Sequence, residues 1–337
     1  MRFSNFGRPA AVIAAAAATL VGLAACSSTP AAEPASNGGA SADFPKGNIT
    51  LIVPYGAGGP TDISARALAQ DLEAELGVTI VVENRPGASG ITGLSEVATS
   101  KADGYTLTYS TGDGFVQSEL RDGVAYSFDS FEPVAGTISQ PYIIVTGADG
   151  ISDFSDLKKK SSVTYASTGN GAPTHLNMLM MFDELDVDAT QVPFNGAAEA
   201  VQAVVGGQVD VAMLDASVAM PQIASGALKA VAVLTPDGEE LDYLEGTPTL
   251  ESLKVDTSAM TMTVWGVAAP AGTDASVVEI LREAVLAAAE GENFQEFTQA
   301  NYMPLLTAED EASWYADLAK TAKTSKDALA KFGISLT

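Results

Sequence analysis

The feature that most limits the fold of this chain is a short motif that occurs twice. Residues 56–62 read Gly-Ala-Gly-Gly-Pro-Thr-Asp and residues 169–175 read Gly-Asn-Gly-Ala-Pro-Thr-His, so both copies keep Gly-x-Gly-x-Pro-Thr. Each copy follows an apolar run typical of a buried strand and precedes apolar residues at helical spacing. The repetition predicts two successive units in which a strand, a glycine-rich turn and a helix follow one another.

The residue types of this motif suit the binding of an anion by the backbone. Glycine allows positive φ angles and lets a ligand approach the backbone without meeting a Cβ. Proline fits the first position of a helix, where its missing N–H costs no hydrogen bond. The N–H groups that follow stay unpaired at the positive end of the helix dipole and can point at a negative group. Two such loops predict two half-sites that face one another across a cleft and bind one ligand together.

Strand-like and helix-like segments alternate along the chain. Strands are expected at 49–55, 79–83, 105–110, 142–146, 163–166, 209–214 and 228–234, and helices at 60–77, 91–100, 174–182, 197–205, 221–225, 275–289 and 309–331. This alternation predicts an α/β protein with parallel sheets covered by helices on both faces, in which ligands bind at the carboxyl ends of the strands. A body of this length is expected to divide into two such units.

The first 43 residues have the pattern of a targeting segment rather than of a folded domain. Arg2 and Arg8 precede a run of apolar or small residues from 10 to 25, which is short for a membrane span and typical of a secretory signal. The run ends in Leu-Ala-Ala before Cys26, which resembles the lipobox of bacterial lipoproteins; the alternative is a signal peptide followed by an incidental cysteine. Residues 26–43 predict a flexible tether. We therefore expect a signal peptide at 1–25, lipidation of Cys26, and a body anchored to the extracytoplasmic face of the cell membrane.

Composition excludes several classes of function. The 337 residues include 17 Lys and Arg against 42 Asp and Glu, a net charge of −25, so the basic surface that nucleic acid binding requires is missing. A single Cys and a single His exclude a disulfide framework, a thiolate zinc cluster and a multi-histidine metal site. Salt screens exposed charge within about 10 Å, so backbone N–H groups in a shielded cleft can still hold a carboxylate. We expect no metal, no cofactor and no nucleic acid partner.

Six segments spread over most of the chain carry a family resemblance. They are ITLIVPYGAGGPTDISAR at 49–66, VENRPGASG at 82–90, DGYTL at 103–107, the segment 193–210 ending in VVGGQVD, LKAVAV at 228–233 and GVAAPAG at 266–272. In this order they resemble the solute-binding receptors of tripartite tricarboxylate transporters, also called the Bordetella uptake gene family.

The resemblance implies a two-lobed periplasmic-binding-protein fold, type II-like, which closes like a Venus flytrap on a small organic acid in the cleft between the lobes. It implies two crossovers, with lobe 1 at about 44–142 and 268–337, lobe 2 at about 143–267, and hinge strands near 142–146 and 264–268. Such a receptor is not an enzyme; it is expected to act as a monomer and to deliver its ligand to integral-membrane permease subunits.

The expected ligand contacts lie near the ends of strands. The resemblance implies the loop Tyr55–Asp62, the facing loop Ser167–His175, the segment Ser110–Gly112, and Asp215. With Phe194 as an aromatic wall, the predicted contacts are Tyr55, Gly58, Gly59, Pro60, Thr61, Asp62, Ser110, Thr111, Gly112, Ser167, Thr168, Gly169, Asn170, Gly171, Thr174, His175, Phe194 and Asp215.

The sequence is compatible with two roles for some of these residues. Asp62 either contacts the ligand or caps its helix, and His175 either contacts the ligand or packs locally. Two departures from the family pattern, Leu179 and Leu214, change the expected pocket wall. A tricarboxylate, a dicarboxylate, an aromatic acid and an amino acid all remain possible ligands.

Two other functions fit parts of the sequence. Gly56-x-Gly58 after one strand and Glu83 at the end of the next mimic a dinucleotide-binding enzyme, but Thr61 stands where the third small residue belongs. A ligand sensor that presents its closed form to a signalling kinase has the same sequence features as a transport receptor. No Gly-x-Ser-x-Gly nucleophile elbow accompanies the single histidine.

Overall fold

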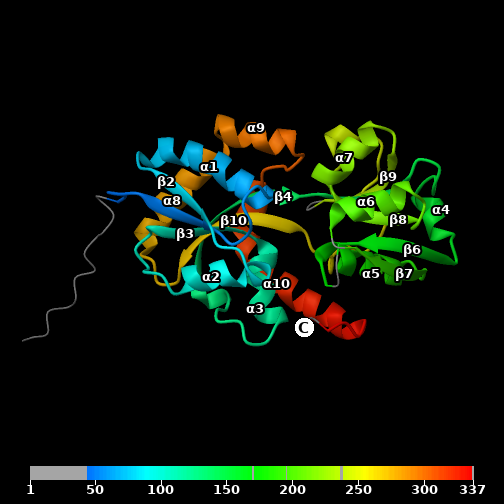
Figure 1. Ribbon diagram of the computed structural model, residues 1–337, viewed down its shortest axis with the longest axis horizontal. Helices are drawn as coiled ribbons and strands as arrows, with labels where there is room; N and C mark the ends of the chain where they lie inside the picture. Colours follow the sequence, from blue (N-terminus) through cyan, green and yellow to red (C-terminus); the bar gives the residue numbers. More distant parts are fainter. Residues whose placement is uncertain (1–43, 169–170, 195, 236–237, 336–337) are drawn as a thin grey trace, which may run out of the picture. The chain divides into compact units, whose positions relative to one another are not determined.

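The computed structural model describes residues 44–168, 171–194, 196–235 and 238–335, and within them the strands form two five-stranded sheets (Figure 1). The expected signal peptide, the tether with Cys26, and residues 169–170 of the second glycine-rich loop lie outside the described residues. Both sheets carry helices on each face, as the sequence predicts.

The first sheet has the strand order β2-β1-β3-β10-β4. Its strands are β1 (Ile49–Val53), β2 (Ile80–Asn84), β3 (Thr106–Thr111), β4 (Phe131–Gln140) and β10 (Thr263–Pro270). Strand β1 pairs in parallel with β2 and β3, whereas β10 runs antiparallel to β3 and β4. The prediction of purely parallel sheets is therefore wrong: the sheet is mixed.

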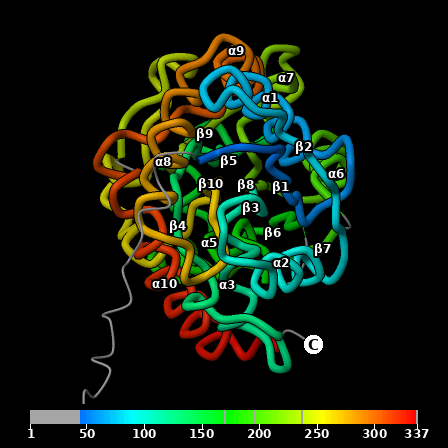
Figure 2. Tube along the Cα trace, turned by 90° about the vertical axis from the view of Figure 1, so that its left-hand side faces the viewer, coloured from blue at the N-terminus to red at the C-terminus, as the bar shows by residue number. Residues whose placement is uncertain are grey.

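The alternation of β1 explains why helices cover both faces of this sheet. Leu51 and Val53 point into an apolar layer with Leu68 of α1, whereas Ile52 packs on the opposite face with Phe115. The first layer is covered by α1 (Pro60–Leu76), α8 (Ala275–Ala289) and α9 (Glu292–Ala300), and the second by α2 (Ile91–Ala98), α3 (Gly112–Leu120) and α10 (Ala308–Lys331). Helix α9 lies beside α1, and α10 lies beside α3 (Figures 1 and 2).

The second sheet repeats this plan with the strand order β7-β6-β8-β5-β9. Its strands are β5 (Tyr142–Gly147), β6 (Ser162–Ser167), β7 (Asp188–Pro193), β8 (Val211–Asp215) and β9 (Leu228–Leu234). Helices α4 (Phe154–Lys158) and α5 (Pro173–Glu184) cover one face, and α6 (Ala197–Val205) and α7 (Ala216–Ala224) cover the other. Strand β6 is parallel to β7 and β8, and β5 is antiparallel to β8 and β9. By position, β6, β7 and β8 correspond to β1, β2 and β3.

The chain passes between the two sheets through short connections. Strand β4 ends at Gln140 and β5 begins in the other sheet at Tyr142, so a single residue separates them. The return precedes Thr263, because β10 pairs with β4 from Thr263 to Pro270. The lobe boundary expected at 267/268 falls inside this strand. Strands β5 and β10 are the first strands after the chain passes from one sheet to the other, and both are antiparallel to their neighbours. Their direction is set by this passage between the sheets, so helix–strand alternation alone does not reveal it.

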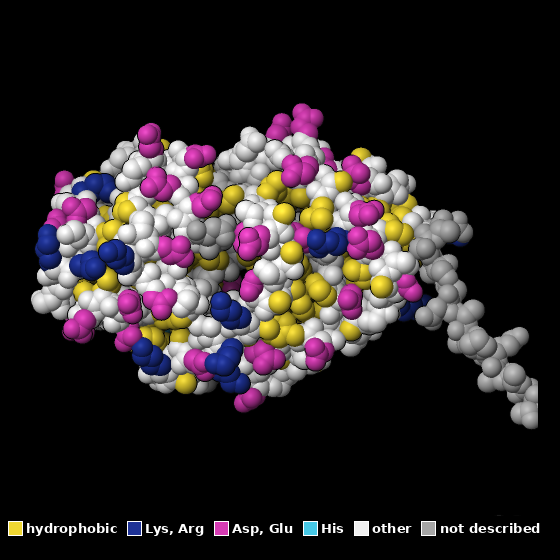
Figure 3. Space-filling model, turned by 180° about the vertical axis from the view of Figure 1, so that it is seen from behind, with side chains coloured by type: hydrophobic (Ala, Val, Ile, Leu, Met, Phe, Trp, Pro, Cys, Tyr) yellow, Lys and Arg dark blue, Asp and Glu magenta, His cyan; other side chains and the backbone are white. Residues whose placement is uncertain are grey.

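Three short 3-10 helices complete the described structure: η2 (Ala88–Gly90), η3 (Phe128–Ser130) and η4 (Asp242–Leu244). Over the described ranges, none of the helices combines the length and apolarity needed to span a bilayer. Acidic side chains are spread across the face shown in Figure 3, where Lys and Arg side chains are fewer.

Candidate ligand-binding site

The first glycine-rich loop folds back on the helix that it precedes. Gly58 has φ +79°, and its N–H donates to Oδ2 of Asp62 at 2.8 Å. Pro60 occupies the first turn of α1, and the N-cap Gly59 has extended backbone angles and no side-chain cap. Since a Cβ on Gly58 would meet no neighbouring atom, glycine is required there by its φ angle and not by lack of space.

The second loop repeats this arrangement in the other sheet. Gly171 has φ +76°, and its N–H donates to Nδ1 of His175 at 2.9 Å. Pro173 occupies the first turn of α5, and the N-cap Ala172 is extended and uncapped. The seventh residue of each motif therefore accepts from the third residue of its own loop, whether that seventh residue is Asp or His.

Asp62 is held in this role by further hydrogen bonds. Its Oδ1 forms an ion pair with Arg66 Nη2 at 2.9 Å and accepts from Asn84 Nδ2 at 3.0 Å. Asn84 Nδ2 also lies 3.1 Å from the carbonyl oxygen of Tyr55. Burial raises the pKa of Asp62, but the bonds from Arg66, Gly58 and Asn84 outweigh it, so the pKa lies below its usual range. The carboxylate stays ionised and stabilises the loop.

His175 is buried against the second sheet. Its ring stacks on Tyr165, with ring centroids 6.3 Å apart. Burial lowers the pKa of His175, which favours the neutral imidazole that can accept at Nδ1. The tautomer that fits this bond carries its proton on Nε2.

The two helices keep their first-turn N–H groups for other partners. N–H groups in a helix's first turn have no intrahelical acceptor. The nearby hydroxyl groups already have hydrogen-bond partners. Thr61 Oγ1 accepts from Trp265 Nε1 at 3.0 Å, and the Oγ1 atoms of Thr168 and Thr174 are hydrogen-bonded to one another at 3.1 Å. Each helix therefore offers backbone donors and a positive dipole end to an anion.

Both helix N-termini line cavities that adjoin one another. The first cavity, of about 350 Å³, is lined by Tyr55, Gly59, Pro60, Thr61, Ser89, Thr111, Asp113 and Gln117. The second, of about 210 Å³, is lined by Ser89, Asp113, Val116, Gln117, Leu120, Arg121, Thr168, Gly171, Ala172, Pro173, Leu176, Thr261, Thr321 and Ser325. The two cavities share the lining residues Ser89, Asp113 and Gln117, so they adjoin one another, with the start of α1 at the first and the start of α5 at the second.

Seven predicted residues line this space: Tyr55, Gly59, Pro60, Thr61 and Thr111 in the first cavity, and Thr168 and Gly171 in the second. Gly58, Asp62, Ser110, Gly112, Ser167, Thr174, His175, Phe194 and Asp215 line neither cavity. Gly169 and Asn170 lie outside the described residues.

Sequence reasoning missed the residues that form the shared wall and the far side of the second cavity. Asp113, Gln117 and Arg121 belong to α3 or directly follow it, and Ser89 lies in η2. The signal for Asp113 was available, because it follows a predicted strand by three residues, near the carboxyl end where ligands bind.

A series of hydrogen bonds connects Asp113 to the first residues of β5 and β10, the strands that follow the two connections between the sheets. Tyr142, the first residue of β5, joins its hydroxyl to Thr263 Oγ1 at 2.7 Å. Thr263, the first residue of β10, donates to Oδ2 of Asp113 at 3.3 Å, so the Tyr142 hydroxyl is the donor to Thr263. Burial, together with the negative charge of Asp215, raises the pKa of Asp113 to about 6, against the lowering effect of the Thr263 bond.

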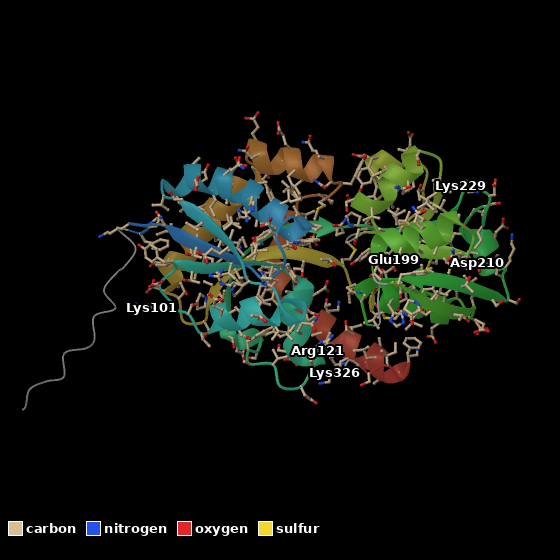
Figure 4. The ribbon with its side chains drawn as sticks, viewed as in Figure 1. Lys101, Arg121, Glu199, Asp210, Lys229 and Lys326 are labelled. Carbon is tan, nitrogen blue, oxygen red and sulfur yellow. The ribbon has the colours of Figure 1, made fainter. Side chains whose placement is uncertain are left out.

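A larger depression of about 610 Å³ lies elsewhere on the second sheet. Its carboxylate, Asp210, is already paired: Oδ1 accepts from Lys160 Nζ at 3.0 Å, and Oδ2 accepts from the Thr164 N–H at 2.8 Å. Figure 4 shows Asp210 far from Arg121, which lines the second cavity beside α10. Neither glycine-rich loop reaches this depression, so we do not place the ligand there.

The described residues offer no arrangement of three or more His, Cys, Asp or Glu side chains that could hold a metal ion. Two α/β sheets that each contribute a helix N-terminus to one of two adjoining cavities define the class: this is the fold of the two-lobed periplasmic binding proteins. A TctC solute binding protein from Polaromonas, without ligand, matches with a TM-score of 0.76 and 27% identity, over 86% of this chain and 99% of that chain. MatC from Rhodopseudomonas palustris with bound malate matches with a TM-score of 0.66 and 26% identity, over 85% and 100%.

Sequence comparison gives the family. The model of the tripartite tricarboxylate transporter family receptor matches residues 64–334. A UPF0065 protein of Bordetella pertussis is 30% identical over 267 residues, 77% of this chain and 81% of that protein. The chain belongs to the tripartite tricarboxylate transporter receptor family, whose members are extracytoplasmic solute-binding proteins and not enzymes. This confirms the predicted family and the predicted fold class.

Proposed function

We propose that this protein captures a small organic carboxylate in the two adjoining cavities and delivers it to the integral-membrane permease subunits of a tripartite tricarboxylate-type transporter. The observation that carries the proposal is the pair of matched helix starts, with Gly58 and Gly171 at nearly equal φ angles and one helix at each cavity. Unpaired N–H groups at both ends suit a ligand that presents carboxylate oxygens. The malate bound to MatC is a ligand of this chemistry in a relative.

Closure of two lobes on the ligand supplies the transport signal in this proposal. We assign one lobe to the first sheet, with residues 44–140 and the chain from Thr263 onward, and the other lobe to the second sheet. A ligand that contacts α1 and α5 together stabilises the arrangement in which both helix starts line the adjoining cavities. The permease then recognises that arrangement, and no covalent bond is made or broken.

The dinucleotide-binding alternative fits the loop poorly. Close approach of a pyrophosphate requires a small third residue, yet that position is Thr61, whose Oγ1 accepts from the indole of Trp265. The threonine is buried in this contact and connects α1 to β10. A nicotinamide enzyme is therefore not our proposal.

Two measurements test carboxylate capture. Native mass spectrometry of the purified protein reveals a co-purified acid, and calorimetric titration with dicarboxylates, tricarboxylates, aromatic acids and amino acids measures affinity. We expect one chemical class to bind with one molecule per chain. Failure of every acid to bind, together with an empty native spectrum, contradicts the proposal. Uptake of the labelled acid by cells that lack the receptor gene then separates transport from sensing, since only a transport receptor is required for uptake.

We also propose that Cys26 carries a lipid that anchors the protein to the extracytoplasmic face of the membrane. Its place after Leu-Ala-Ala supports this assignment, as does the chain of about 17 tether-like residues that follows. Cys26→Ser should move the protein from the membrane fraction to the soluble fraction without changing ligand affinity. Retention of the variant by the membrane contradicts the assignment.

A further inference from the structure

Asp113 is an unexpected residue in a cavity built to receive an anion. Asp113 is among the residues that line both the first and the second cavity, together with Ser89 and Gln117. A carboxylate at this shared wall repels a ligand that carries negative charge alone. The adjoining cavities therefore contain attractive groups for an anion at the two helix starts and a repulsive group at the wall that they share.

Asp113 has no basic partner in the described part of the chain. Among the described residues its carboxylate accepts the weak bond from Thr263 Oγ1 at 3.3 Å on Oδ2, and none of them donates to Oδ1. The salt bridges of the described residues do not include Asp113 or Asp215. The groups that affect the charge of Asp113 are Asp215 and the hydroxyl of Thr263, and neither is a cation.

Asp113 is also not used as a helix cap. The N-cap of α3 is Thr111, and no side chain caps this helix. Its counterpart in the second sheet, Asp215, ends β8 just as Asp113 follows β3, and the Asp215 side chain forms no cap on α7. Neither side chain therefore caps its helix, although Asp113 lies in the first turn of α3, where the helix dipole favours a negative charge.

The burial of Asp113 has a cost that a ligand can remove. Placing a carboxylate in a shielded cavity without a cation is unfavourable, and the pKa of about 6 reflects that cost. The titratable and charged groups around this carboxyl are Tyr55, Tyr142, Asp215 and, at the far end of α3, Arg121, which also lines the second cavity. An ammonium group in the cavity would supply the missing positive charge.

We propose that the ligand carries a protonated amine in addition to its carboxylate, and that Asp113 is the residue that selects for this amine. The inference rests on the proposed function, since it assumes that carboxylate oxygens bind at the helix starts. The ligand class is then the amino acids and related zwitterionic amino carboxylates. Asp215 contributes negative potential to the same region without lining the cavity.

The test uses pairs of acids that differ only by an amino group: succinate with aspartate, glutarate with glutamate, and adipate with 2-aminoadipate. Calorimetric titration at pH 7.5 compares the wild-type protein with Asp113→Asn, which keeps the shape and an acceptor for Thr263. Asp122→Asn, in the exposed turn after α3, removes the same charge and serves as the control. We expect the amino member of at least one pair to bind at least tenfold more tightly to the wild type and to Asp122→Asn. In Asp113→Asn this preference should fall by tenfold or more.

Tight binding of the plain diacids, or an amine preference that survives in Asp113→Asn, overturns the inference while leaving carboxylate capture intact. If no member of any pair binds but a tricarboxylate or an aromatic acid without an amine does, the inference is overturned and carboxylate capture stands; failure of every acid, with an empty native spectrum, overturns both. A circular dichroism melt of each variant shows whether it is folded. If Asp113→Asn is unfolded, Asp113→Ser replaces it in the same comparison.

Discussion

The two glycines with positive φ allow a sharp test of the double-loop site. Gly58 at +79° and Gly171 at +76° each precede a helix that lines the cavity. An alanine in the left-handed region costs about 1–2 kcal/mol relative to its preferred conformations. We predict that Gly58→Ala and Gly171→Ala each lose this amount of unfolding free energy, because each loop is kept in its strained conformation or is forced to change.

A control glycine separates strain from binding. Gly226 has φ +77°, follows α7, and lines neither cavity, and a Cβ there, as at Gly58, meets no atom within 4 Å. Gly226→Ala should therefore lose the same 1–2 kcal/mol, or about 2–4 °C in Tm for each kcal/mol. Only the loop variants should also lose ligand affinity, by tenfold or more, because a changed φ turns the N–H groups at the helix start away from the ligand.

Calorimetric titration measures the affinity, and thermal denaturation without ligand measures the stability. The fluorescence of Trp265 offers a second readout of a change in the first loop, since its indole N–H donates to Thr61 in the first turn of α1. If Gly58→Ala and Gly171→Ala bind the ligand as well as Gly226→Ala does, the backbone of these loops does not hold it. The reasoning from the repeated motif would then be refuted.

Three further variants test the contacts around the site and the core. Burial lowers the pKa of His175, so the stability that its neutral ring contributes is lost as pH falls below about 6.5. His175→Asn should remove this acid sensitivity in a pH series of thermal melts, while its side-chain oxygen still accepts from the Gly171 N–H. An unchanged pH profile would contradict the assignment. The raised pKa of Asp113 makes the folded state bind more protons than the unfolded state between pH 4 and 6, so stability should fall as pH rises through that range. Asp113→Asn should therefore be more stable than the wild type at pH 7 by up to about 3 kcal/mol. Equal urea midpoints of the two proteins would contradict this prediction. Arg282→Met should cost about 3 kcal/mol or more in urea denaturation, because it leaves the buried carboxylate of Glu311 without its partner, whereas Glu311→Gln should cost less.

Much of the fold follows from the turn and helix-capping residues that bound each apolar segment of the sequence. The expected ranges 197–205 and 275–289 match α6 and α8, and 228–234 matches β9. Gly196 and Gly206 flank α6, Asp274 caps the start of α8, and Gly226 lies two residues before β9. Where such signals surround a periodic apolar pattern, the sequence determines the element with little help from the rest of the molecule.

The missed elements lack those signals. Strand β4 contains Pro133 and Gly136, which indicate a break, yet tertiary packing against β10 keeps it extended over ten residues. Strand β7 is an edge strand with exposed and intermediate positions, so no apolar run identifies it. The direction of β5 and β10 depends on where the chain crosses between the sheets, which is a property of the whole topology.

The site was predictable in its backbone and less so in its side chains. The motif identified both helix starts, because glycine and proline at fixed positions have direct conformational consequences. The roles of Asp62 and His175 depend on hydrogen bonds within each loop, and both residues accept from their own glycine and line neither cavity. Asp113 follows a predicted strand by three residues, which points to the carboxyl edge of the sheet, but its place in both cavities also depends on the packing of α3 on that sheet.

The contacts that join the two halves differ in kind from those that hold each half together. Apolar layers fill both faces of each sheet, whereas the end of α10 meets α5 through the exposed pair Lys331 and Asp183, at 2.5 Å. A surface pair of this type is worth at most about 1 kcal/mol. Its rupture leaves no apolar core exposed, and salt alone can weaken it. The rings of Tyr243 and Tyr302 add an aromatic contact between the halves, with centroids 4.9 Å apart, yet each buried apolar cluster belongs to one half alone. A change in the angle between the halves therefore leaves both cores intact.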